Sequence, residues 1–511
     1  MPSTRHRATL RAALDAPLTR RRFIQAGAAG AAGAALLPAA GCGLDPGGDD
    51  GKYNVLLLII DSVRPDHVGA YGTPVVQTPN IDALAAKGLR FNRAFPEAMV
   101  TIPARRSIFT SKRIFPFRNH VVNEELGTSP GWASIDDNEH TWTTVLKNEG
   151  YFVAQVTDNP HTGFTRAYKP FRLSYDRFVS VVGQSGFLKP PESVPMSTVN
   201  HWLPPVLRDD RYVPGMRKYL ANSGEGVDEE LTCCARVFKE GVKMLDDVKG
   251  REPFALVVDC FDPHEPWSPP KKYIDLYGDP DYEGPEIGVT RYGLSGYLTK
   301  DELRRLRAVY AAELTMTDRW LGHFMDRFYE LGLDENTVVL LLSDHGYLLG
   351  DRGYAGKVPS EMHPELAQVP FIVVHPEDKA VGQVSSYFAS THDVGPTLLS
   401  TVGIEPPGYL EGADLSPLLD GREPSEKREF HYGGMYNRFY IRTDDWALIA
   451  DTRGEERKLY DLTLDKFEIH NVVDKNPKLG EELYRQVLES AGGPLPYYTP
   501  EDLGLEEPAG S

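Results

Sequence analysis

Five short apolar runs, separated by long stretches of mixed polarity, constrain the fold of this chain more than any other feature of its sequence. The runs cover residues 55–60, 152–156, 254–258, 338–342 and 371–374. Continuous apolar character without alternation is typical of strands that are buried on both faces of a parallel sheet. We therefore predict that these runs form the buried parallel strands of one sheet.

Helical periodicity fills much of the sequence between these runs. It is clearest over residues 303–331, where one stripe of apolar side chains consists of Tyr310, Leu314, Leu321, Phe324 and Phe328. Strands that alternate with helices predict an α/β fold with helices on both faces of the sheet. The segment 183–226 is rich in Pro and Gly and shows little periodicity, so we expect a long surface loop there.

The sequence pattern changes near residue 425. Short apolar runs at 439–441, 446–449 and 458–462 predict antiparallel strands, and residues 477–491 predict a helix. We expect a large domain over residues 53–424, with a mixed, mostly parallel sheet sandwiched by helices. A small C-terminal α+β domain over residues 425–511 should pack on it.

The first 42 residues differ from the rest of the chain. Residues 19–25, Thr-Arg-Arg-Arg-Phe-Ile-Gln, resemble a twin-arginine export signal, and a weakly apolar Gly/Ala-rich stretch follows. We therefore expect an exported, periplasmic or extracytoplasmic protein. Cys42 follows small residues, as does the lipid-carrying cysteine of bacterial lipoproteins, so lipid attachment to the membrane and simple signal cleavage both stay open.

Charge and cysteine content exclude some functions. The chain has 73 acidic and 55 basic residues and a formal net charge of -18, which argues against nucleic-acid binding. Three cysteines follow Cys42, namely Cys233, Cys234 and Cys260. Their spacing matches neither a disulfide framework nor a zinc motif.

Polar residues stand where three of the apolar runs end. Asp61 follows the first run, residues 262–267 including His264 follow the third, and Asp344 and His345 follow the fourth. The ligand crevice of an open α/β sheet lies at the carboxyl ends of its strands, so we expect these side chains to converge. Each has a structural alternative as a cap, a turn or a rigid loop, but together they favour a functional site.

Thr101 opens a predicted helix that extends to about residue 112. As its N-cap, with Pro103 in the first turn, Thr101 has a purely structural explanation. A helix N-terminus also offers free amides to an anion, and Arg105 stands one turn further on. A hydroxyl beside a metal ion at this place could attack a tetrahedral ester.

These motifs resemble the sulfatase family of the alkaline phosphatase superfamily. The similarity covers residues 54–72, 78–95, 101–112, 262–266, 343–346, Lys357, 392–399 and 459–462, in the family's order. The resemblance implies an alkaline phosphatase-like fold and a catalytic domain over residues 53–424. It also implies an ester hydrolase that acts on a small-molecule, glycan or lipid ester.

The resemblance also implies roles for individual residues. Asp61, Asp344 and His345 would bind the metal, and Thr101 would be the nucleophile and a further ligand. Arg105, His264 and Lys357 would bind the ester oxygens, with one of the last two protonating the leaving group. Three further residues lie beside site motifs and are expected to bind substrate: His161, Trp267 and His363.

Two departures from the family bear on the chemistry. Many sulfatases have a pair of carboxylates where this chain has Asp61-Ser62, and the mixed oxygen and imidazole set favours one Mn or Zn ion over Ca. The family converts Cys or Ser to formylglycine, but the β-methyl group of Thr101 prevents formation of the aldehyde, so no formylglycine is expected.

We therefore expect phosphate or phosphonate esters, including diesters, to be favoured over sulfate. A true sulfuric ester hydrolase that lacks formylglycine is one alternative. An inactive relative that binds sulfated or phosphorylated glycans is another.

Overall fold

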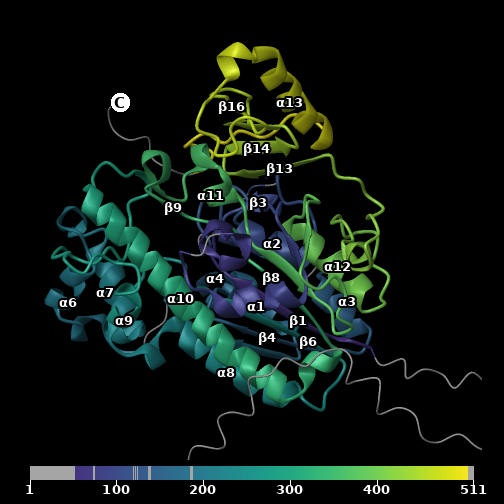
Figure 1. Ribbon diagram of the computed structural model, residues 1–511, viewed down its shortest axis with the longest axis horizontal. Helices are drawn as coiled ribbons and strands as arrows, with labels where there is room; N and C mark the ends of the chain where they lie inside the picture. Colours follow the sequence, from purple (N-terminus) through teal and green to yellow (C-terminus); the bar gives the residue numbers. More distant parts are fainter. Residues whose placement is uncertain are drawn as a thin grey trace, which may run out of the picture. The chain divides into compact units, whose positions relative to one another are not determined.

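An eight-stranded mixed sheet lies at the centre of the described part of the chain, and its order is β12-β2-β11-β8-β1-β6-β4-β5. Figure 1 labels β1, β4, β6 and β8 among its strands. The computed structural model describes residues 52–72, 75–118, 120, 122–123, 125–135, 140–184 and 188–503. The strands of the sheet are β1 (Asn54–Ile60), β2 (Leu89–Phe91), β4 (Phe152–Thr157), β5 (Arg177–Ser180), β6 (Phe254–Cys260), β8 (Thr337–Leu342), β11 (Phe371–Val374) and β12 (Gln383–Ser385). The predicted fold class is confirmed.

The direction of one strand differs from the prediction. β1 pairs in parallel with β6 and β8, and β4 pairs in parallel with β5 and β6. β11, expected to be parallel, is antiparallel to both β8 and β2. The one α-helix in the fully described connection from β8 to β11 is the four-residue α11 (Pro364–Ala367), so no crossover helix returns the chain to the other end of the strands. A short apolar run gives no information about strand direction.

Helices cover both faces of the sheet, and the side chains of β1 alternate between two cores. Leu56 and Leu58 face a core that includes side chains of α1 (Pro79–Lys87), α8 (Cys233–Val248) and α10 (Lys300–Glu330). Val55 and Leu57 face the opposite core, which includes side chains of α2 (Thr101–Thr110), α3 (Trp142–Asn148) and α12 (Val394–Thr401). Burial on both faces explains why the central strands lack alternation in the sequence.

The segment 183–226 contributes to the core, whereas a surface loop was expected. It contains the helices α6 (Met196–His201) and α7 (Val213–Asn222), and its Val199 and Leu203 are fully buried. Prolines divide the segment into short helical pieces, which removes the periodicity that would have revealed it. The remaining short helices are α4 (Pro160–Phe164), α5 (Lys169–Leu173) and α9 (Lys271–Ile274).

A second, five-stranded sheet carries the C-terminal part of the chain. Its order is β16-β15-β14-β13-β3, with β3 (Ala98–Met99), β13 (Phe430–Met435), β14 (Arg438–Thr443), β15 (Trp446–Asp451) and β16 (Lys458–Asp461). Helix α13 (Pro477–Ser490) covers one face, and side chains of the other face meet the large sheet's loops. β3 precedes α2 directly, so this sheet is tied to the start of that helix. The division at residues 424 and 425 stays a prediction.

The sequence did not reveal β13, because two glycines lower its strand propensity. A Cβ atom on Gly433 would come within 2.6 Å of the Pro96 carbonyl oxygen, and one on Gly434 within 2.2 Å of the Phe115 ring. The close approach of β13 to β3 and Phe115 therefore requires glycine at both positions. A third, three-stranded sheet consists of β7 (Gly293–Leu294), β9 (Leu348–Leu349) and β10 (Tyr354–Gly356).

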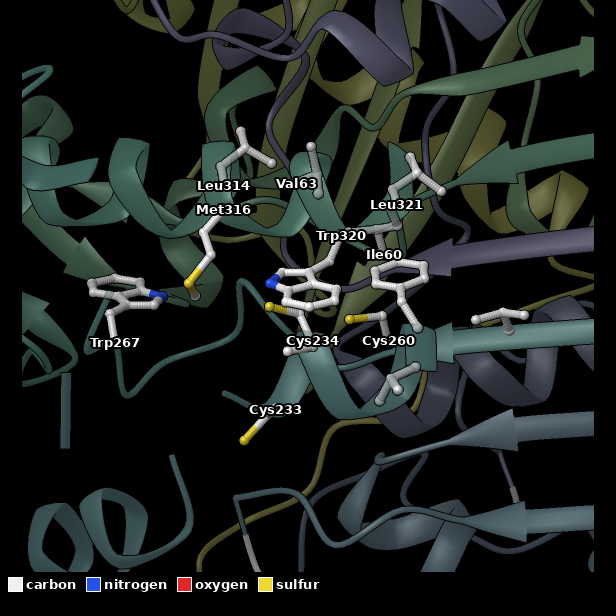
Figure 2. Close-up of a cluster of buried hydrophobic side chains, with 14 of the residues drawn as sticks. Ile60, Val63, Cys233, Cys234, Cys260, Trp267, Leu314, Met316, Trp320 and Leu321 are labelled. Atoms are coloured by element: carbon white, nitrogen blue, oxygen red, sulfur yellow. The ribbon is translucent and has the colours of Figure 1, made fainter. Parts of the chain in front are cut away.

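Three thiols lie buried in the core on the α8 side of the sheet (Figure 2). Cys233 and Cys234 begin α8, Cys260 ends β6, and all three are free, as expected from their spacing. Burial raises the pKa of each thiol. The expected export signal over residues 1–42, including Cys42, lies outside the described residues. None of the described helices is long and apolar enough to span a membrane.

Candidate active site

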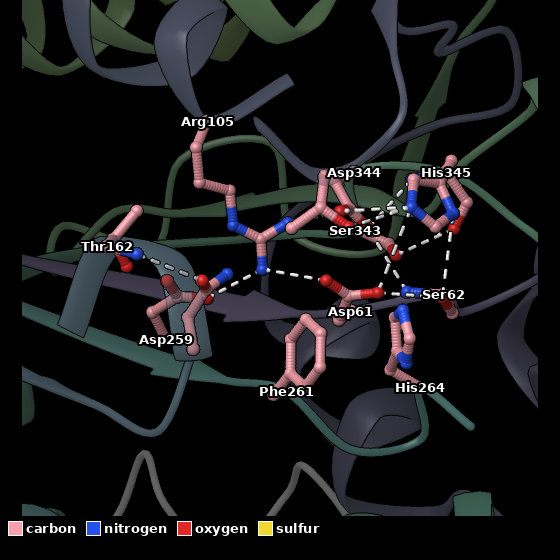
Figure 3. A network of polar contacts seen from close by, with 12 residues as sticks. Asp61, Ser62, Arg105, Thr162, Asp259, Phe261, His264, Ser343, Asp344 and His345 are labelled. Atoms are coloured by element: carbon pink, nitrogen blue, oxygen red, sulfur yellow. Dashed lines mark hydrogen bonds and ion pairs between the residues drawn. The ribbon is translucent and has the colours of Figure 1, made fainter. Parts of the chain in front are cut away.

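Neighbouring parallel strands bring the predicted site residues to one edge of the large sheet. Ile59 of β1 is level with Asp259 of β6 and with Leu342 of β8, so Asp61 and Asp344 follow strands that end together. The backbone N–H of Ser62 donates to Oδ1 of Asp344 at 3.1 Å. The predicted convergence at the carboxyl ends of the strands is therefore present in the structure (Figure 3).

Asp61, Asp344 and His345 form a buried group whose ligand atoms lie within 4.8 Å of one another, which is compact enough to hold a metal ion. Nε2 of His345 lies 3.3 Å from Oδ2 of Asp344 and 3.9 Å from Oδ1 of Asp61. Nδ1 of His345 lies 2.9 Å from the Gly346 carbonyl oxygen, which can only accept, so the ring proton belongs on Nδ1. The lone pair of Nε2 is thereby directed at the two carboxylates, as in a metal-binding histidine.

The electrostatics of this group also suit a cation. Burial and the neighbouring Asp344 carboxylate raise the pKa of Asp61 well above its usual value. Burial opposes ionisation of Asp344 as well, but Arg105 and His345 outweigh it and lower the pKa of Asp344. Burial lowers the pKa of His345 to about 4, so its imidazole is neutral at physiological pH. A divalent ion would relieve the repulsion between the carboxylates.

Thr101 lies beside this group. Its Oγ1 is 3.5 Å from Nε2 of His345, and its side chain is buried. It is the first residue of α2, while Val100 occupies the N-cap position and no side-chain cap hydrogen bond is present. The predicted N-cap role is therefore wrong by one position, and the Thr101 hydroxyl is not committed to capping the helix.

Arg105 is fully buried among three carboxylates. Its guanidinium contacts Asp344, lies 2.7 Å from Oδ1 of Asp259 and lies 3.1 Å from Oδ2 of Asp61. Asp259 was not predicted as a site residue, although it is the one charged residue within the β6 strand. An acidic residue inside a buried strand was the signal in the sequence that could have revealed it. Asp259 also accepts a hydrogen bond from Thr157.

Lys357 and His264, the two remaining predicted catalytic residues, contact each other. Nζ of Lys357 is 3.0 Å from Nε2 of His264, 2.9 Å from both carboxylate oxygens of Glu265 and 2.9 Å from Oη of Tyr292. Burial, then the Lys357 charge, lowers the pKa of His264 well below its usual value. The contacts with Glu265 and Tyr292 were not predicted, because they connect three segments that are far apart in the sequence.

The three predicted substrate-binding residues have different surroundings. His161 in α4 is partly buried, packs edge-on against Trp132, and has its pKa lowered to about 4 by burial and by the nearby Arg105. Trp267 is fully buried and packs against Tyr310 and Tyr347, so its position is that of a core residue.

His363 is also buried. Its Nδ1 lies 2.7 Å from Oε2 of Glu468, and Glu468 is paired with Arg442 of β14. His363 therefore connects the segment that follows Lys357 to the C-terminal sheet. His363 and Trp267 are as buried as Arg105, and their role in substrate binding stays a prediction.

Comparison with known proteins identifies the family to which the chain belongs. The sequence profile of the sulfatase family matches residues 53–404. The chain belongs to the sulfatase family. The profile of the C-terminal region of N-sulphoglucosamine sulphohydrolase matches residues 350–490. An arylsulfatase of Clostridium perfringens (strain 13 / Type A) is 26% identical over 461 residues, which cover 83% of this chain and 90% of that relative.

Two solved structures share the fold. A phosphonate monoester hydrolase of Agrobacterium radiobacter has a TM-score of 0.64 at 21% identity, over 86% of this chain and 95% of that chain. A protein solved in complex with its substrate D-glucosamine-2-N,6-O-disulfate has a TM-score of 0.64 at 18% identity, and the match covers 89% of this chain and 98% of that chain. As a member of the sulfatase family, the protein is an ester hydrolase of the alkaline phosphatase superfamily. Sulfatase-family enzymes bind a metal ion, and the Asp61, Asp344 and His345 group could hold one.

Proposed function

We propose that this protein is an exported, metal-dependent hydrolase that favours phosphate or phosphonate esters, including diesters, over sulfate esters and uses Thr101 as its nucleophile. The observation that carries the proposal is the position of the Thr101 hydroxyl. It stands at the first turn of α2, 3.5 Å from the unprotonated nitrogen of His345 and beside two buried carboxylates.

We assign Asp61, Asp344, His345 and Thr101 as the ligands of one divalent ion. Two carboxylates, a hydroxyl and a neutral imidazole form a mixed set that suits Mn or Zn better than Ca, which prefers oxygen ligands. When bound, the ion supplies Lewis-acid polarisation of the ester and lowers the pKa of the Thr101 hydroxyl. Ser62 supports the set, because its hydroxyl donates to Oδ1 of Asp61 at 2.7 Å.

The reaction has two displacements in this proposal. Deprotonated Oγ1 of Thr101 forms a bond to phosphorus as the bond from phosphorus to the leaving alcohol breaks, and Arg105 binds the equatorial oxygens. Water then displaces Oγ1 from phosphorus as an alkoxide and passes its own proton to the group that protonated the leaving alcohol, which returns both groups to their starting states. A sulfated threonine would need the same second step, because Thr101 has no aldehyde through which to expel sulfate.

We assign protonation of the leaving alcohol to Lys357 rather than to His264. Nδ1 of His264 faces the Glu265 carbonyl oxygen and therefore carries the ring proton, which leaves Nε2 as an acceptor for the Lys357 ammonium. In this state the Lys357 ammonium carries the proton that is transferred to the leaving alcohol, and His264 orients the ammonium by accepting a hydrogen bond from it.

A panel of chromogenic substrates tests the proposal. We expect the metal-free protein to be inactive, Mn or Zn to restore turnover, and phosphodiesters or phosphonate monoesters to be cleaved with a higher kcat/KM than the aryl sulfate of the same leaving group. Dominant sulfate turnover that depends on Thr101 would favour the sulfuric ester hydrolase instead. Binding of sulfated or phosphorylated glycans without turnover of any ester would favour an inactive relative.

We also propose that residues 1–42 direct export through the twin-arginine route. Replacing Arg20 and Arg21 with lysine should retain the protein in the cytoplasm, as measured by cell fractionation. Labelling with a radioactive fatty acid would distinguish a lipid on Cys42 from simple cleavage of the signal.

A further inference from the structure

The Lys357 ammonium is neutralised inside the protein. Both oxygens of the Glu265 carboxylate lie 2.9 Å from Nζ, and the side chains of Lys357 and Glu265 are only 3% and 6% exposed. The hydroxyl of Tyr292 contacts both partners, at 2.9 Å from Nζ and in a short contact with Glu265. This is a buried charge pair at the catalytic site, whose strength solvent does not greatly reduce.

Arg105, the second cation of the site, is neutralised in the same way. Two of its three carboxylate partners, Asp61 and Asp344, are assigned to the metal, which leaves Asp259 at 2.7 Å as the partner of Arg105 that is not assigned to the metal. Asp259 and Glu265 therefore each compensate one cation. Two positive side chains at an anion-binding site thus carry little net charge toward a substrate.

We propose that Glu265 determines substrate charge, so that the site accepts esters with a single negative charge and discriminates against dianionic phosphate monoesters. Phosphodiesters and phosphonate monoesters carry one negative charge at neutral pH. A phosphate monoester carries close to two, because its second pKa is about 6. The inference rests on the proposed function, but it applies equally to sulfate esters, which are also monoanions.

The expected size of the effect follows from distance. An ester oxygen that binds the Lys357 ammonium would lie two hydrogen-bond lengths from the Glu265 carboxylate, which is roughly 6 Å. At that distance and an effective dielectric constant of about 20, one additional negative charge should weaken transition-state binding by about tenfold to a hundredfold.

Two variants separate charge from hydrogen bonding. Glu265→Gln removes the negative charge and keeps the shape of the side chain, whereas Tyr292→Phe removes a hydrogen bond to the same Lys357 and changes no charge. We would measure kcat/KM for p-nitrophenyl phosphate and for bis(p-nitrophenyl) phosphate, which share a leaving group. Glu265→Gln should raise the monoester-to-diester ratio by about tenfold or more, while Tyr292→Phe should leave it within about threefold. An unchanged ratio in a folded Glu265→Gln protein would overturn the proposal.

A measurement on the unaltered protein covers the case in which Glu265→Gln does not fold. Between about pH 6 and pH 8 the monoanionic fraction of a phosphate monoester falls about tenfold per pH unit. The monoester-to-diester ratio of the wild-type enzyme should fall over this range by up to the discrimination factor, because titrations of the enzyme affect both substrates and cancel. A ratio that stays constant or rises over this range would contradict discrimination by charge.

Failure of the proposed function gives a different result. If the protein turns over only sulfate esters, the discrimination is measured by inhibition of that turnover with two non-hydrolysed anions. Monomethyl phenylphosphonate, a monoanion, should inhibit the wild type more strongly than the phenylphosphonate dianion, and Glu265→Gln should reduce or reverse this order. Equal inhibition by the two anions in both proteins would overturn the inference while leaving the sulfatase activity intact.

Discussion

Replacing Thr101 with valine or with serine separates the contribution of its hydroxyl group from the contribution of its methyl group. Thr101→Val keeps the branched shape and removes the hydroxyl, whereas Thr101→Ser keeps the hydroxyl and removes the methyl. The two variants test whether this buried side chain acts as a nucleophile or only fills space at the start of α2.

The structure predicts small and similar effects on stability. The closest polar contact of the hydroxyl is at 3.5 Å, the limit of a hydrogen bond, so Thr101→Val should change the free energy of unfolding by less than about 1 kcal/mol. Thr101→Ser loses one buried methyl group and should lower the free energy of unfolding by about 0.5–1.5 kcal/mol. Urea denaturation measures both changes.

The effects on activity should differ strongly. Loss of the nucleophile in Thr101→Val should reduce kcat/KM by a thousandfold or more, which corresponds to at least about 4 kcal/mol of transition-state stabilisation. Thr101→Ser should stay within about tenfold of the wild type, because a serine hydroxyl can occupy the same place. The assay is cleavage of bis(p-nitrophenyl) phosphate with Mn present, with quenched samples analysed by mass spectrometry for a phosphorylated Thr101. A folded Thr101→Val protein with more than about a tenth of wild-type activity would refute the assignment.

Four further predictions concern the metal, the pH dependence of stability, and the contacts of Glu468 and His363 beside the C-terminal sheet. Chelation of the metal should abolish turnover. Restoring Mn or Zn at a hundred times its dissociation constant should raise the free energy of unfolding by about 2.7 kcal/mol, which is measured as a rise in Tm. An unchanged Tm would argue against a metal at this site. Because the pKa of His345 is lowered to about 4 in the folded protein, His345 of the unfolded metal-free chain binds its proton at a higher pH than His345 of the folded chain does. The contribution of His345 to stability should therefore be complete above about pH 6.5 and should be lost as the pH falls toward 4, with unfolding free energies across that window as the check. Glu468→Gln leaves Arg442 and His363 without their buried carboxylate and should lower the free energy of unfolding by about 3–5 kcal/mol in urea titrations. His363→Gln should likewise lower stability while leaving KM within about twofold, and a large rise in KM without loss of stability would support the substrate-binding role of His363 instead.

Much of the candidate site could be located from the sequence because its residues follow strands in the chain. Asp61, Asp344 and His345 were placed together on the argument that parallel strands end at one edge, and the register of β1, β6 and β8 supports it. The substrate-binding roles of Trp267 and His363 stay predictions. Both stand beside site motifs, yet both are buried in contacts that the motifs do not encode.

The sequence by itself determined the local features of this protein. Apolar runs and helical stripes identified the central strands and α10, since burial and periodicity are properties of a short segment. Tertiary structure alone decided the direction of β11, the existence of β13 between closely packed neighbours, and the partners of the two site cations. Asp259 and Glu265 neutralise Arg105 and Lys357, although 154 and 92 residues separate the members of these pairs. Charge compensation depends on distance in space, which no local pattern in the chain records.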